Sequence, residues 1–299
     1  MKSRILNSGV YALILGALIF AALILGFTVA ILAAPASAGM PPKRIVSLSL
    51  ASDEILLDLL DHCQASDRLV ALSTFADDPS SSSVTDKAKR VLKRVHSEPE
   101  SLFQLKPDLV IGASFNRPEL LSAIKSKAIN LLVLDQFDSF RDIANNIRAI
   151  GRAVHCASDS EVMAKRFLDS VATQVNPKMT TKRAISYNPD LTVMGSKTIF
   201  DDIVTHAGLI NAAAEKGLAR WPKIDTEVLL GMNPDIIIVL GEGTPAKRAE
   251  IARHPAWGRL KSVRNQNLIF LRPATALSTS HYAAEALREL RDKVKSRQL

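Results

Sequence analysis

Two segments of this chain repeat one pattern 127 residues apart. The segments 100–114 and 227–241 each begin with a glutamate, carry Pro-Asp seven and eight residues later, and end in an apolar run. Proline cannot continue a helix and keeps the residue before it out of the helical region, so each copy predicts a short helix, a turn and a buried strand. A repeat of this kind predicts two similar lobes in one chain, with a cleft between them.

Strand-like and helix-like segments alternate on both sides of the repeat. Apolar runs predict strands at 44–49, 68–73, 107–113, 130–135, 183–187, 236–240 and 268–271. Such alternation is typical of parallel sheets covered by helices on both faces, and Ser52 with the acids after it is expected to cap the first helix. We predict an α/β fold with two Rossmann-like lobes, 39–157 and 177–299. One long helix within 158–176 is expected to connect them.

The N-terminus has the anatomy of an export signal. Lys2 and Arg4 precede an apolar run over 10–34, and Ala36-Ser-Ala38 has the form of a signal-peptidase site. The run spans 25 residues, and a membrane helix needs about 20. Residues 1–38 are therefore predicted to be a cleaved signal peptide or an N-terminal membrane anchor. In both cases the rest of the chain is expected in the periplasm or at the extracytoplasmic face of the membrane.

The charge of the chain gives no indication of a nucleic-acid partner. The formal net charge is +8, and it becomes +6 without residues 1–38, which contain Lys2, Arg4 and no acidic residue. The basic residues are scattered except at 87–94, which we interpret as a solvated face, with an anion-attracting rim as the alternative. No nucleic-acid-binding motif is present, so we expect no such partner.

Cys63 and Cys156 are the only cysteines, and they do not form a metal or redox motif. In an oxidising compartment they can pair, but 93 residues separate them and the sequence does not supply the distance between them. A disulfide and two buried free thiols therefore both stay open.

Several segments in a shared order resemble the periplasmic binding proteins of the iron-siderophore and vitamin B12 type, which capture substrates for ABC importers. These segments are 44–54, 105–111, 142–151, 221–229, 233–239 and 255–260. The resemblance implies a monomeric, non-enzymatic protein without a cofactor, whose single connecting helix limits closure of the lobes. It implies that a ferric siderophore, corrinoid or haem binds in the cleft and passes to the membrane subunits of the importer.

The resemblance also indicates where the ligand binds, because ligands of parallel sheets lie at the carboxyl ends of the strands. The expected ligand-binding residues are Phe75, His96, Phe115, Asn116, Tyr187, Trp221, Ser278 and His281. Aromatic faces provide contact area for a flat macrocycle or a catecholate, and polar groups orient it. Core burial is the alternative for Phe75 and Phe115, and it is the preferred interpretation for Trp257.

The identity of the ligand stays open at this stage. Asp78 stands where the family commonly has an aromatic residue, which weakens a corrinoid assignment. Arginines that can contact an anionic siderophore are Arg94, Arg117, Arg220 and Arg272.

Glu100 and Glu227, which begin the two copies of the repeat, match the positions where the family presents one carboxylate per lobe to the permease. Two charge-assisted contacts with arginines of the membrane subunits would orient docking and speed the encounter. The alternative is a local role, because carboxylates are favoured at helix N-termini.

Two other classes of protein are alternatives. A metal-ion-binding protein of related architecture needs converging ligands, but the six histidines are scattered without i,i+4 pairs, so no metal site is predicted. A two-lobed α/β enzyme is the second alternative. The chain has no G-x-G-x-x-G after a strand, no P-loop and no G-x-S-x-G, and this argues against enzymatic activity.

Overall fold

The computed structural model describes residues 39–95, 98–173 and 181–297. From Pro41 onward the chain forms one compact unit. None of the helices in these ranges is long and apolar enough to span a membrane. The apolar run at 10–34 lies outside the described residues, so its assignment as a signal peptide or an anchor stays a prediction.

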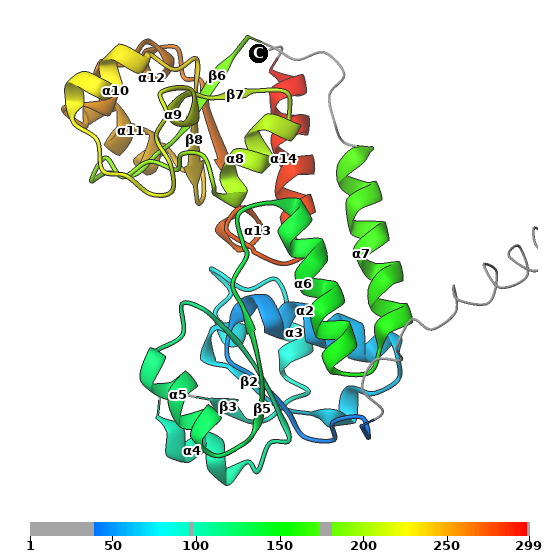
Figure 1. The fold of residues 1–299 in the computed structure, drawn as a ribbon. Coiled ribbons are helices and arrows are strands. Elements are labelled where there is room, and N and C mark those ends of the chain that lie inside the picture. Colours follow the sequence, from blue (N-terminus) through cyan, green and yellow to red (C-terminus); the bar gives the residue numbers. More distant parts are fainter. Residues whose placement is uncertain (1–38, 96–97, 174–180, 298–299) are drawn as a thin grey trace, which may run out of the picture. The chain divides into compact units, whose positions relative to one another are not determined.

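The first sheet has five parallel strands in the order β3-β2-β1-β4-β5. They are β1 (Ile45–Ser47), β2 (Leu69–Ser73), β3 (Arg94–Val95), β4 (Leu109–Ala113) and β5 (Asn130–Leu134). The helices of this half are α2 (Leu50–His62), α3 (Thr85–Ala88), α4 (Pro99–Gln104) and α5 (Pro118–Ser126), with the 3₁₀ turns η1 (Ser66–Arg68) and η2 (Thr74–Asp77). Leu102, Leu120 and Ile124 of α4 and α5 pack on one face of the sheet, and α2 packs on the other (Figure 1).

Helix α2 begins earlier than the sequence predicted. Ser49 is its N-cap, and its side chain accepts a hydrogen bond from the backbone N–H of Ser52 at 3.3 Å. The expected capping role of Ser52 is therefore wrong. As a result, Asp53 and Glu54 lie inside the helix, and both are fully buried.

The second sheet has four parallel strands in the order β7-β6-β8-β9. They are β6 (Arg183–Ser186), β7 (Ile210–Asn211), β8 (Ile236–Leu240) and β9 (Leu268–Leu271). The helices of this half are α8 (Ile199–His206), α9 (Ala212–Glu215), α10 (Thr226–Met232), α11 (Pro245–Arg253), α12 (Lys261–Arg264), α13 (Pro273–Ala276) and α14 (Ala283–Ser296), with the 3₁₀ turn η3 (Trp257–Arg259). Trp257 is fully buried in this half, as predicted.

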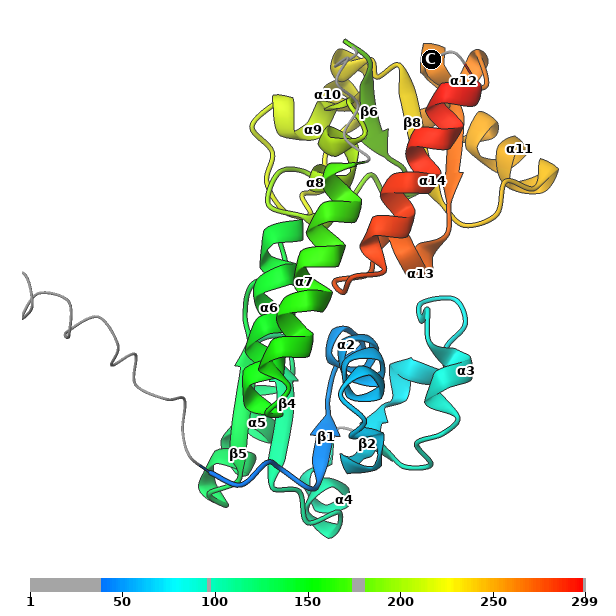
Figure 2. The same cartoon turned by 90° about the vertical axis from the view of Figure 1, so that its right-hand side faces the viewer.

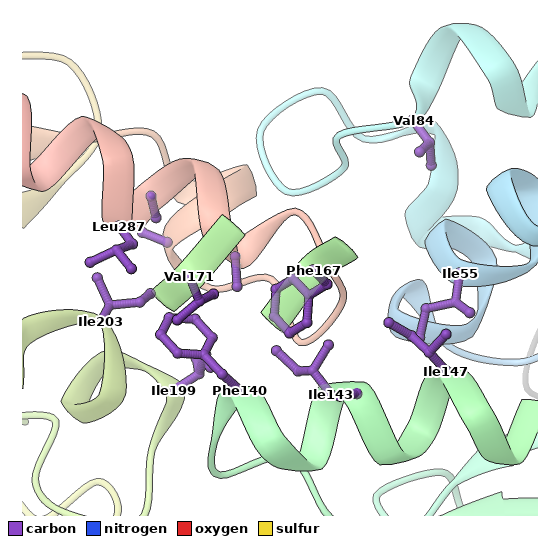
Figure 3. Close-up of a cluster of buried hydrophobic side chains, with 14 of the residues drawn as sticks. Ile55, Val84, Phe140, Ile143, Ile147, Phe167, Val171, Ile199, Ile203 and Leu287 are labelled. Carbon is purple, nitrogen blue, oxygen red and sulfur yellow. The ribbon is translucent and has the colours of Figure 1, made fainter. Parts of the chain in front are cut away.

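Two helices join the sheets: α6 (Phe140–Ala153) and α7 (Ala157–Ala172) lie side by side (Figure 2). Ile143, Ile147, Ile150 and Val154 are spaced four, three and four residues apart, which predicts a one-sided helix, and all four are buried. This face of α6 shares one hydrophobic cluster with α2, α7, α8 and α14, so the core is continuous from the first half to the second (Figure 3). The α/β class with two parallel sheets is confirmed, whereas the exact lobe boundaries at 157 and 177 stay a prediction.

The repeated segments occupy equivalent places in the two sheets. Strands β4 and β8 each lie beside the first strand of their sheet. In each copy the aspartate after the proline binds the start of that neighbouring strand: Asp108 accepts from the backbone N–H of Arg44 at 2.9 Å, and Asp235 from that of Arg183 at 2.9 Å. The Pro-Asp pair therefore turns the chain and ties the turn to the next strand.

Cys63 and Cys156 form a disulfide, with their Cα atoms 6.1 Å apart. Cys63 is the C-cap of α2, and Cys156 is the N-cap of α7. The sequence left open whether Cys63 and Cys156 are bonded or free, and the fold brings them close enough to pair. The bond fastens the beginning of the connecting helix α7 to the first half of the molecule.

Candidate functional site

The expected ligand-binding residues are distributed over several loops of both halves. Phe75 lies in η2 after β2, Phe115 and Asn116 lie between β4 and α5, Tyr187 follows β6, Trp221 precedes α10, and Ser278 and His281 lie between α13 and α14. His96 lies outside the described residues. Parallel strands end at one edge of their sheet, so the loops of Phe75, Phe115, Asn116 and Tyr187 occupy the edges where ligands of α/β sheets bind. The loops of Trp221, Ser278 and His281 connect helices instead.

The aromatic residues in these loops are exposed. The exposed fractions are 60% for Phe75, 66% for Phe115 and 53% for Trp221. The alternative that Phe75 and Phe115 belong to the core is therefore wrong. Large apolar side chains on strand-end loops are available to a partner or a ligand because nothing in the described chain covers them.

Contacts link Phe115 of the first half to Trp221 of the second. The ring of Phe115 lies 5.2 Å from that of Phe137, in the loop between β5 and α6. The next residue, Asp138, places a carboxylate oxygen 3.8 Å from the guanidinium of Arg220, and Trp221 follows Arg220 in the chain. Phe137, which is half-buried, was not predicted as a ligand residue, although it lies in the loop after β5 as Phe115 lies in the loop after β4.

A pocket of about 510 Å³ lies among strand-end loops of both halves. Its lining residues are Pro79, Ser80, Ser82, Ser83, Gly241, Glu242, Arg272, Pro273, Ala274, Tyr282 and Glu285. Gly241 directly follows β8, and Arg272 directly follows β9. The pocket offers hydroxyl and charged groups, so it suits the polar part of a ligand better than an apolar ring.

Two expected ligand residues, Asn116 and Tyr187, have partners inside their own half. The Asn116 amide accepts from the backbone N–H of Ala113 at 2.7 Å and donates to the carbonyl of Leu48 at 3.0 Å. Tyr187 is buried against Trp257, and burial raises its pKa to about 12. These contacts give both side chains structural roles, and a contact of either with a ligand stays a prediction.

Ser278 belongs to a buried cluster around Glu54 of α2. The Glu54 carboxylate accepts hydrogen bonds from Ser278 Oγ at 2.9 Å, from Ser280 Oγ at 2.6 Å and from the backbone N–H of Ser83 at 3.0 Å. Burial raises the pKa of Glu54 above its ordinary value, although these hydrogen bonds oppose the shift. The cluster joins α2 of the first half to the chain that enters α14.

His281 belongs to a second cluster, one helical turn along α2. Asp58 accepts from His281 Nε2 at 2.8 Å and from the Tyr282 hydroxyl at 2.9 Å, and it forms an ion pair with Lys87. Burial opposes ionisation of Asp58, but these hydrogen bonds outweigh it and hold its pKa well below the ordinary value. We call the two clusters around Glu54 and Asp58 the α2 network.

His281 also lines a second pocket, of about 430 Å³, between α2 and α7. The other lining residues are Asp58, His62, Asp159, Val162, Met163, Arg166, Phe167 and Ser170. None of them lies in a loop after a strand. This pocket is therefore separate from the strand-end loops, and we do not assign the ligand to it.

Glu100 and Glu227 are exposed and occupy the second position of α4 and α10. In α10 the capping side chain is Asp225, which accepts from the backbone N–H of Val228 at 2.8 Å. Within the described ranges, neither glutamate forms an ion pair or a hydrogen bond through its side chain. Both carboxylates are thus available to an external partner.

The basic cluster at 87–94 is largely neutralised by neighbouring acids. Its ion pairs are Lys87–Asp58, Lys89–Asp86, Arg90–Asp61 and Arg94–Asp77. This pairing favours the interpretation as a solvated face over an anion-attracting rim. Residues 39–95, 98–173 and 181–297 contain no group of three or more histidine, cysteine or acidic residues placed to hold a metal ion.

Comparison with known proteins matches most of the described chain to one protein-family profile. The family profile described as periplasmic binding protein matches residues 45–275. Among curated proteins, the molybdate-binding protein MolA of Haemophilus influenzae is 23% identical over 212 residues, which is 63% of this chain and 60% of that protein's length.

Solved structures show the same fold. The periplasmic haem-binding protein RhuT of Roseiflexus sp. RS-1 has a TM-score of 0.70 and 23% identity, over 84% of this chain and 97% of that one. The periplasmic vitamin B12-binding protein BtuF of Vibrio cholerae has a TM-score of 0.68 and 21% identity, over 86% of this chain and 98% of that one. At these identities the comparison of structures establishes the fold alone.

Proposed function

We propose that this chain, which belongs to the periplasmic binding protein family, captures a metal chelate outside the cytoplasm and delivers it to an ABC importer. The chelate is a ferric siderophore, a corrinoid or haem. It is bound and released unchanged, so the protein is not an enzyme. Proteins with this fold that bind haem or vitamin B12 support the proposal.

The observation that carries the proposal is the presence of exposed aromatic side chains on loops of both halves. Phe115, which contacts the half-buried ring of Phe137, comes from the loop after β4, and Trp221 comes from the loop between α9 and α10. The ion pair between Asp138 and Arg220 links the two loops. Rings on such loops provide the broad apolar contacts that a macrocycle or a catecholate needs. A protein that bound only a bare ion would have no use for exposed rings at this place.

The delivery step is proposed for Glu100 and Glu227. Each is exposed and is the second residue of a short helix. Each also begins one copy of the same repeat, so the two halves present equivalent carboxylates. Arginines on two similar membrane subunits are suitable partners, because carboxylate and guanidinium form bidentate hydrogen bonds.

Titration of purified residues 39–299 with haemin, cyanocobalamin and a ferric siderophore tests the proposal. One of them is expected to bind stoichiometrically and to be recovered unchanged. Trp221→Ala should weaken that binding about 10-fold or more, because a buried aromatic contact at a binding surface typically contributes over 1 kcal/mol. Leu92→Ala is the control: Leu92 is exposed but lies before β3, at the amino end of a strand.

Chemical turnover of the chelate, or equal weakening by Trp221→Ala and Leu92→Ala, would contradict the proposal. A small oxyanion is the second candidate ligand, because the curated relative is a molybdate-binding protein. Molybdate therefore belongs in the same titration. Binding of molybdate without any chelate would favour that alternative.

A further inference from the structure

Arg220 has an unusual backbone conformation. In the described part of the chain, the non-glycine residues with positive φ are Gln64, Lys106, Ala128, His155, Leu191, Lys197, Arg220, Asn233 and Gln266. Six of these nine end a helix, where the left-handed conformation is common. Leu191, Lys197 and Arg220 do not, so helix capping does not explain them.

The backbone around Arg220 is held by a neighbouring segment. Its N–H donates to the carbonyl of Ser196 at 2.7 Å, and its own carbonyl accepts from the N–H of Gly195 at 2.9 Å. The segments approach so closely that a Cβ on Gly195 would lie 2.1 Å from the carbonyl oxygen of Leu218. These contacts fix Arg220 at a φ of 62°, a conformation that costs a non-glycine residue about 1–2 kcal/mol.

The side chain of Arg220, in contrast, is loosely held. It is 68% exposed, and its ion pair with Asp138 has a distance of 3.8 Å, too long for a hydrogen bond. Trp221 is exposed beside it. Arg220 therefore combines a firmly held backbone with a guanidinium that is only weakly paired with Asp138, and it directly precedes the exposed Trp221. Strain of this kind, kept at an exposed residue, is typical of functional sites.

We infer that Arg220 selects the charge of the ligand, so that the chelate carries a peripheral oxyanion that replaces Asp138 as the partner of the guanidinium. Carboxylate and catecholate oxygens share this chemistry, and arginine binds them through two parallel N–H groups. The inference rests on the proposed function and narrows its ligand to anionic chelates. An uncharged chelate would leave Arg220 with Asp138 and gain nothing from it.

Two matched pairs of probes test the inference. Haemin is compared with its uncharged dimethyl ester, and an anionic ferric tricatecholate with an uncharged ferric trihydroxamate. Wild-type protein should prefer the anionic member of the pair that it binds. Arg220→Gln should weaken the anionic member about 10- to 100-fold, the usual worth of a charged hydrogen bond, and change the uncharged member less than about twofold.

Two further variants separate ligand recognition from folding. Asp138→Asn removes the competing partner and should tighten the anionic probe severalfold, about what an exposed ion pair is worth. Arg220→Gly relieves the strain, so it should weaken the anionic probe as Arg220→Gln does while the Tm stays equal to wild type or rises. A purely structural role for Arg220 would instead lower the Tm. Arg253→Gln, at an exposed arginine at the end of α11, is the control for the loss of one charge.

The possible results distinguish the inference from the proposed function. If a chelate binds but the uncharged probe is preferred, or Arg220→Gln weakens both members alike, the inference is wrong and the proposed function stands. If Arg220→Gly lowers the Tm, the inference is also wrong. If none of these probes nor cyanocobalamin binds, the proposed function fails and the inference fails with it.

Discussion

Replacement of Glu54 by alanine should destabilise the protein strongly, because this carboxylate is the centre of a buried cluster. Glu54 is fully buried and accepts three hydrogen bonds, two from the buried hydroxyls of Ser278 and Ser280 and one from the backbone of Ser83. Its removal leaves these donors without their acceptor and opens a cavity. Each unsatisfied buried donor costs about 1–3 kcal/mol. We expect a loss of about 3–5 kcal/mol in the free energy of unfolding.

Urea unfolding of residues 39–299, followed by circular dichroism, measures this loss as a shift of the midpoint at constant m-value. Glu54→Gln keeps one acceptor oxygen and the shape of the side chain, so it should lose about half as much. Glu119→Ala is the matched control, because Glu119 is exposed and its distance to Arg117 is 3.9 Å. Its effect should stay within about 0.5 kcal/mol. If the urea midpoint of Glu54→Ala equals that of Glu119→Ala, the buried cluster around Glu54 does not stabilise the folded state.

Three further predictions concern other parts of the chain. Burial raises the pKa of Asp53 to about 7, so the folded state holds this proton more tightly than the unfolded chain. The stabilisation is complete below about pH 4 and is lost as the pH rises to about 7. Asp53→Asn should therefore reduce the fall in urea midpoint between pH 5 and pH 8, and an unchanged slope would contradict the assignment. The Cys63→Ser/Cys156→Ser variant should lose about 2–4 kcal/mol in calorimetry or urea unfolding, and an unchanged midpoint would show that the bond adds nothing. Glu100→Ala/Glu227→Ala should keep the chelate affinity of wild type and lose uptake in cells, whereas loss of both would refute a docking role.

The sequence predicted those features of the fold that depend on local pattern. The Pro-Asp repeat located β4 and β8, and the spacing of isoleucines located the buried face of α6. The helix predicted within 158–176 overlaps α7 (Ala157–Ala172), whereas its role as the single connection between the lobes stays a prediction. The place of the exposed Phe115 also follows from position, since it lies in a loop where a parallel strand ends. Trp221 lies between α9 and α10, so its expected role came from the family resemblance.

Features that depend on contacts between distant residues were not predicted. Glu54 is 224 residues from Ser278, and its sequence context shows only a carboxylate near the start of a helix. The disulfide required the distance between two helix ends. Asn116 illustrates the same limit. It was expected to contact the ligand because it follows a strand, whereas its amide forms hydrogen bonds with backbone groups of Ala113 and Leu48.

The contacts between the two halves differ in strength, and this difference predicts which contacts break at the lowest free-energy cost when a ligand binds. The α2 network and the core around α7 bury carboxylates and apolar side chains, so their disruption costs several kcal/mol. The Asp138–Arg220 pair is exposed and lies at 3.8 Å, and a pair of this kind contributes about 0–1 kcal/mol. A ligand that binds beside Trp221 gains enough from one charged hydrogen bond to replace the pair, but not to open the α2 network. Binding should therefore rearrange the loops that hold Asp138 and Trp221 and leave the attachment of α2 to α14 unchanged.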